Sequence, residues 1–181
     1  MKSLLLLVTL FIFGMGIARA QKVFVCRDAH ISFFSTAPLE DISAQTDSAV
    51  SSINLQTGAV YFKVAISSFQ FEKGLMQKHF NEHYLESDRY PFAEFKGKIL
   101  NFTPLDSEGI DPVTVEGSLT IHGVTKVYKT AGTLELKAGE LGATSIFKIR
   151  LADHQIKIPK LLFQNIAEVV EVKVYAVYDL Q

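Results

Sequence analysis

Apolar and polar residues alternate along most of the chain with a period of two. The clearest stretch is residues 58–66, whose apolar face carries Val60, Phe62, Val64 and Ile66. The alternation recurs at residues 113–121, 144–151 and 170–178, whose apolar faces carry Val115, Leu119, Ile121, Phe147, Ile149, Val172 and Val174. A period of two is typical of β-strands that bury one face. The pattern therefore predicts a strand-dominated domain.

Five further segments have the composition of strands, at residues 22–27, 30–36, 41–55, 93–102 and 124–137. Turn-forming residues separate the strands at 56–58, 107–109, 122–123 and 138–140. So many strands joined by short turns predict an antiparallel meander, and closure into a barrel would remove the exposed sheet edges. We therefore expect an all-β fold, an antiparallel β-barrel of about eight strands.

One polar segment, residues 73–90, breaks the alternation. Its apolar residues recur at helix-like spacing, at Leu75, Met76, Phe80, Tyr84 and Leu85. This spacing predicts one or two short helices that end at the extended step before Pro91, because a residue that precedes proline is biased away from helix. Residues 161–166 predict a further single helical turn.

The N-terminal segment has the three parts of a secretory signal peptide. Lys2 supplies a positive charge, residues 4–17 are almost uninterruptedly apolar, and residues 18–20 form a small-x-small cleavage pattern. A transmembrane anchor is the alternative, but the apolar run is shorter than the roughly 18 to 20 residues that cross a bilayer. We expect a cleaved signal peptide at residues 1–20, one mature domain at residues 21–181, and a periplasmic or secreted location.

Cys26 is the only cysteine, so the exported domain cannot form an intramolecular disulfide. It lies several residues beyond the apolar run, which does not fit the cleavage box of a lipoprotein. In an apolar strand such a cysteine is expected to be a small buried hydrophobic residue. The sequence does not decide whether Cys26 forms an intermolecular disulfide. It also does not decide whether two barrels pair as a homodimer.

The charge pattern excludes one class of partner. The chain has 18 lysines and arginines and 19 aspartates and glutamates; without Lys2 and Arg19, the remaining 16 basic residues leave a net charge of −3. Both signs are interspersed, and the sequence has no basic patch of the kind that nucleic-acid binding requires. No second long apolar run follows the first. We expect no nucleic-acid partner and no transmembrane segment.

His79, Glu82 and His83 form the one metal-like motif. The H-x-x-E-H pattern places two histidines one helical turn apart, where they can bind zinc while the glutamate acts as a base. The motif is short, and a zinc hydrolase needs a further downstream ligand within a larger helical domain. The sequence has no nucleophile elbow and no glycine-rich phosphate loop. We expect a noncatalytic protein without metal or cofactor, and a metal-dependent hydrolase is the minor alternative.

An eight-stranded barrel has an interior that side chains fill or that holds one slender ligand. Inward-facing glycines such as Gly97 and Gly117 favour a cavity. The alternative is a dry packed core, and the alternation of apolar residues is the same in both cases. For a hollow barrel, the alternation predicts these ligand-binding residues: Val60, Phe62, Val64, Ile66, Phe95, Ile99, Val115, Leu119, Ile121, Phe147, Ile149, Val172 and Val174.

Two motifs resemble those of the YceI-like family. The first, residues 79–97, begins with His-Phe, continues through Asp-Arg-Tyr-Pro at 88–91 and ends in an aromatic strand. The second, residues 117–126, reads Gly-Ser-Leu-Thr-Ile-His-Gly-Val-Thr-Lys and is similar to the family's G-x-L-T-h-H-G-V-T-K pattern almost position by position. The second motif is the more specific. Gln77 and Lys78 stand where the family usually has Arg-Asp.

The resemblance implies a lipocalin-like antiparallel β-barrel, and some members bind a polyisoprenoid chain, such as a quinone tail, in an elongated hydrophobic cavity. It therefore implies an exported, noncatalytic carrier of a long apolar lipid, polyisoprenoid or quinone-like. We expect residues 73–90 to form the lid or mouth of the cavity. The alternative is a packed barrel that acts as a stress-response or protein-interaction module without a ligand.

Overall fold

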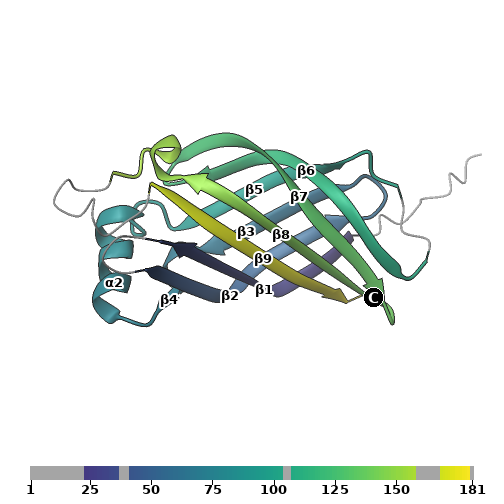
Figure 1. The fold of residues 1–181 in the computed structure, drawn as a ribbon, viewed down its shortest axis with the longest axis horizontal. Helices are drawn as coiled ribbons and strands as arrows, with labels where there is room; N and C mark the ends of the chain where they lie inside the picture. The colour runs from purple at the N-terminus through teal and green to yellow at the C-terminus, as the bar shows by residue number, and fades with distance from the viewer. Residues whose placement is uncertain (1–22, 37–40, 104–106, 158–167, 180–181) are drawn as a thin grey trace, which may run out of the picture.

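The structure is a computed structural model, and it describes residues 23–36, 41–103, 107–157 and 168–179 (Figure 1). The predicted signal peptide at residues 1–20 and the predicted turn at residues 161–166 lie outside the described residues.

In the part of the chain that the structure describes, nine antiparallel strands form a single sheet. They are β1 (Val23–Ser35), β2 (Ile42–Asn54), β3 (Ala59–Ala65), β4 (Gln70–Phe71), β5 (Phe92–Leu100), β6 (Gly109–Ile121), β7 (Val124–Lys137), β8 (Glu140–Arg150) and β9 (Val169–Asp179). Eight of them follow the order β1-β9-β8-β7-β6-β5-β3-β2, and pairing of β1 with β2 closes the barrel. The ninth, β4, adds to β2 outside this ring. The predicted all-β barrel of about eight strands is confirmed.

The first strand differs from the prediction. Residues 22–27 and 30–36 were expected to form two strands, but β1 continues through both segments and pairs with β2 along its length. The pairing register shifts on either side of Ala29. Arg27 and Asp28 are both exposed, so the bulge moves the buried face from the even to the odd residues. This loss of alternation explains the incorrect division.

Two hairpins close with two-residue turns at predicted turn positions; the second turn is one residue shorter than predicted, because Glu140 already belongs to β8. His122 and Gly123 connect β6 to β7, and Ala138 and Gly139 connect β7 to β8. All four residues have φ between 50° and 83°. Positive φ at both central residues is the geometry that matches the twist of antiparallel strands.

The predicted helical segment forms α2 (Gly74–His79), followed by a π-helical turn, η2 (Phe80–Tyr84). The helix ends earlier than predicted, because Glu86 adopts a left-handed conformation with φ of 44°. Two 3₁₀ turns were not predicted, η1 (Ile66–Ser68) and η3 (Leu151–His154). Among the described residues, no helix combines the length and the apolar character of a membrane span.

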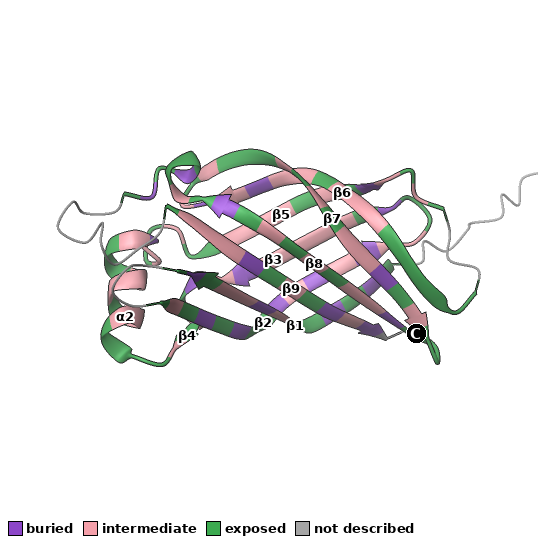
Figure 2. Ribbon diagram, in the orientation of Figure 1, coloured by how far each residue is buried: buried purple, intermediate pink, exposed green. Residues whose placement is uncertain are grey.

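Several fully buried residues lie near the end of the barrel where β9 ends, away from α2 (Figures 1 and 2). Tyr178, Ile53 and Leu141 are among the largest fully buried side chains, and the Tyr178 hydroxyl shares a hydrogen bond with Ser51. Cys26 is 3 % exposed, as expected for a small buried hydrophobic residue, and burial raises the pKa of its thiol. Of these residues, Ile53 and Tyr178 also line the cavity of the barrel.

Candidate functional site

The barrel encloses a cavity of about 580 Å³. All eight barrel strands contribute to its wall, together with residues of α2 and η2. All thirteen residues that the alternation assigned to the inner face line this cavity. Their contact with a ligand stays a prediction, but the interior is hollow, and its size is typical of small-molecule sites.

Gly97 and Gly117 face each other across β5 and β6, on the inner face as expected. The ring of Phe95 lies over both: a Cβ atom on Gly97 would lie 2.5 Å from Phe95 Cζ, and one on Gly117 would lie 2.7 Å from the same atom. The two glycines therefore make room for the Phe95 ring. They shape the wall of the cavity without widening it.

An aromatic cluster that the sequence did not reveal closes the cavity toward α2. Phe33, Phe69, Phe71 and Phe80 come from β1, the η1–β4 segment and η2, and in five pairs of these rings the centroids lie 5.0 to 5.8 Å apart. All four rings line the cavity, as do Met76 and Tyr84 from the helical segment. The cluster therefore fixes α2 and η2 against the end of the barrel.

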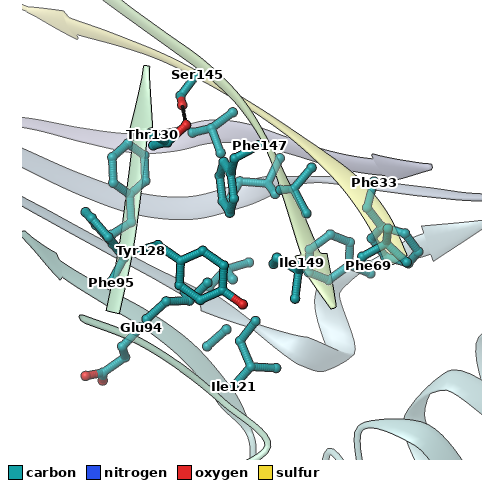
Figure 3. Close-up of a pocket in the computed structure, with 18 of the residues that line it drawn as sticks. Phe33, Phe69, Glu94, Phe95, Ile121, Tyr128, Thr130, Ser145, Phe147 and Ile149 are labelled. Atoms are coloured by element: carbon teal, nitrogen blue, oxygen red, sulfur yellow. Dashed lines mark hydrogen bonds between the residues drawn. The ribbon is translucent and has the colours of Figure 1, made fainter. Parts of the chain in front are cut away.

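The wall holds few polar side chains. Figure 3 shows the hydroxyls of Thr130 and Ser145 among hydrophobic neighbours, and it shows the carboxylate of Glu94 turned away from them. Glu94 pairs outside with Lys63 and Lys96 at 3.4 and 3.3 Å, and despite the opposing effect of desolvation these lysines hold the pKa of the carboxyl below its usual value. The charges near the cavity therefore face away from it.

A buried histidine joins η3 to β7. His154 is 0 % exposed; its Nε2 lies 2.9 Å from the Tyr128 hydroxyl, and its Nδ1 lies 3.0 Å from the carbonyl oxygen of Val124. The neighbouring His122 lies 3.3 Å from both the carbonyl oxygen of His154 and a carboxylate oxygen of Glu86. These contacts tie η3, the β6–β7 turn and the segment after η2 to one another.

Acid is expected to weaken the fold through His154. Burial disfavours the charged imidazole and lowers the pKa of His154 below the ordinary value of about 6.5. Unfolded chains therefore take up a proton before folded ones do, and the stability present above pH 6.5 is lost as the pH falls toward the folded pKa. The slope from this residue reaches at most about 1.4 kcal/mol per pH unit.

Urea unfolding between pH 8 and pH 5 measures this effect. The free energy of unfolding of the wild type should fall with acid more steeply than that of His154→Gln. His30→Gln is the control, because this histidine is partly exposed and pairs at the surface with Asp47. Parallel curves for the wild type and His154→Gln would contradict the assignment.

The metal-like motif lies on the helical segment. The rings of His79 and His83 have centroids 5.4 Å apart, and His79 lines the cavity, whereas Glu82 and His83 are exposed. Within the described ranges, no group of three or more His, Cys, Asp or Glu side chains could hold a metal ion. His79 is thus placed as part of the cavity wall.

A family model described as the YceI-like domain matches residues 20–178. No curated protein matches the chain in sequence. Several solved structures share the fold at low identity. A polyisoprenoid binding domain from Saccharophagus degradans, described as implicated in plant cell wall breakdown, is 16% identical with a TM-score of 0.75, and the alignment covers 90% of this chain and 100% of that one.

Two further structures are also similar. BcnA of Burkholderia cenocepacia is 16% identical with a TM-score of 0.69, over 82% of this chain and 95% of that one. A YCEI protein of Campylobacter jejuni is 17% identical with a TM-score of 0.57, over 74% of this chain and 81% of that one. At these identities the matches establish the barrel fold.

Proposed function

Because this chain belongs to the YceI-like family, we propose that it is an exported, noncatalytic carrier that holds one long apolar lipid of the polyisoprenoid class inside its barrel. The observation that carries the proposal is the cavity of about 580 Å³, whose wall consists mainly of Phe, Val, Ile and Leu side chains. The Saccharophagus degradans domain, which has the same barrel fold, is named a polyisoprenoid binding domain.

The chemistry of the wall suits such a ligand. An isoprenoid chain has no hydrogen bonds to satisfy, so it binds through the area that it removes from water, at about 25 cal/mol per Å² before ordering is subtracted. A charged or strongly polar ligand would lose its hydration without finding partners on this wall. The lining therefore favours a hydrocarbon chain.

An exported protein that binds a polyisoprenoid can carry it through water. A polyisoprenoid outside a membrane meets water along its whole length, and a closed barrel shields it. The signal-peptide pattern of residues 1–20 supports a periplasmic or secreted location for the carrier. The aromatic cluster that joins α2 and η2 to the barrel supports the role of this segment as the lid.

The experiment uses the full chain, purified from the exported fraction of its own host. Native mass spectrometry should show a bound apolar molecule, and extraction with chloroform and methanol should release it. The stripped protein should then bind a dansyl-labelled isoprenoid with saturation. If extraction releases no apolar molecule and the stripped protein does not bind the labelled isoprenoid, the proposal is wrong.

A further inference from the structure

The barrel wall changes where β7 and β8 separate. The pairing of these strands runs from Lys137↔Glu140 to Gly132↔Ser145 and stops there, so residues 124–131 of β7 have no partner in β8. At this point Thr130 and Ser145 turn their hydroxyls inward. The residues paired with them on the adjacent strands, Val115 and Val174, line the same cavity.

The two hydroxyls share one hydrogen-bond acceptor. Ser145 Oγ donates to the carbonyl oxygen of Ala131 at 2.8 Å, and Thr130 Oγ1 donates to the same oxygen at 3.2 Å. The two hydroxyl oxygens lie 3.4 Å apart (Figure 3). Each hydroxyl has one proton and two lone pairs. In this arrangement both protons have acceptors within the group, and the remaining lone pairs of the two oxygens can accept further hydrogen bonds.

Support of the wall does not require two hydroxyls. Ser145 alone satisfies the Ala131 carbonyl, at the shorter distance. Valine has nearly the shape of threonine, and at position 130 it would continue the hydrophobic lining that Val115 provides on β6. Thr130 Oγ1 already contacts Ser145 Oγ and the carbonyl oxygen of Ala131 within the wall. A hydroxyl that the wall does not require, and that has lone pairs left over, is suited to accept a hydrogen bond from a donor inside the cavity.

We propose that Thr130 and Ser145 form an acceptor site for the hydroxyl group of a bound isoprenoid alcohol. An ether or ketone has no proton to donate to this site. A phosphate would need cations. Among the described residues, Lys63 is the one lysine or arginine that lines the cavity, and it pairs with Glu94, whereas His79 belongs to α2. This assignment rests on the proposed lipid binding and adds to it the chemical class and the position of the head group, midway along the wall between β7 and β8.

Geranylgeraniol and its methyl ether test this site, because they differ only by the O–H donor. Affinities are measured by displacement of N-phenyl-1-naphthylamine from the stripped full chain. The wild type should bind the alcohol about threefold to tenfold more tightly than the ether, the usual effect of one neutral hydrogen bond. Simple transfer from water favours the ether, so a preference for the alcohol identifies the hydrogen bond.

In Thr130→Val/Ser145→Ala, the preference should disappear, because the alcohol binds more weakly while the ether binds as before. The matched control is Thr120→Val/Thr125→Ala, which removes an exposed hydroxyl pair that bonds across β6 and β7 and does not line the cavity. This control should keep the preference. Thr130→Val alone, which leaves Ser145 to satisfy Ala131, should reduce it, and melting curves establish that each variant folds.

Three outcomes would overturn the assignment. Equal binding of alcohol and ether by the wild type shows that no acceptor site operates, although the barrel binds lipid. A preference that survives in the folded double variant places the acceptor elsewhere. Failure of the wild type to bind either compound contradicts the proposed function itself, and the acceptor site with it.

Discussion

Ala143→Phe is expected to weaken lipid binding by about 100-fold or more while the barrel stays folded. Ala143 faces the cavity from β8, where its partners Leu134 and Ala176 are buried. A phenyl ring at this position would extend into the empty interior and occupy the path of a slender chain. A 100-fold loss corresponds to about 2.7 kcal/mol of binding free energy. Titration with the dansyl-labelled isoprenoid measures it.

Ala59→Phe is the matched control, because Ala59 is exposed at the start of β3 and does not line the cavity. It introduces the same ring outside the barrel and should leave the affinity unchanged. Melting temperatures of both variants show whether the barrel has formed. Unchanged binding by folded Ala143→Phe would mean that the ligand does not occupy the interior, and the carrier proposal would fail.

The strands were predictable because their side chains alternate across a surface with one buried face. Wherever this holds, as in β3 and β9, the sequence located both the strand and its inner residues. In β7 this alternation does not identify the inner face. Val127 is 72 % exposed, whereas Tyr128 and Thr130 line the cavity. Its alternation gives no inner face, and only pairing with β6 shows that Thr130 points inward.

Long-range packing explains the other residues that sequence reasoning missed. Phe33 is followed by Phe34, so hydrophobicity alone does not tell which of the two faces inward. Phe69 and Phe80 lie in short irregular elements, and they meet Phe33 only when the barrel closes. His154 lies in a 3₁₀ turn, and its burial depends on Tyr128, 26 residues away. Such contacts leave no periodic signal.

Gly117→Ala is expected to destabilise the barrel by about 1 to 3 kcal/mol. A Cβ atom at this position would overlap Gly97 Cα and would lie 2.5 Å from the carbonyl oxygen of Lys96. Both neighbours are main-chain atoms of β5, so no change of side-chain rotamer relieves the overlap. The paired strands β5 and β6 must therefore move apart, and the Phe95 ring, whose Cζ would lie 2.7 Å from the added Cβ atom, is displaced as well. Urea unfolding at pH 7.5 measures the loss.

Gly142→Ala makes the same chemical change where space is available. A Cβ atom there would lie 3.7 Å from its nearest neighbour, the carbonyl oxygen of Glu135, at ordinary van der Waals distance. Alanine restricts the unfolded chain more than glycine does, so this variant should be stabilised by about 0.4 to 1 kcal/mol. The two substitutions should therefore change stability in opposite directions. If Gly117→Ala were as stable as Gly142→Ala, the close approach of β5 and β6 beneath Phe95 would be wrong, and with it the shape of the cavity wall.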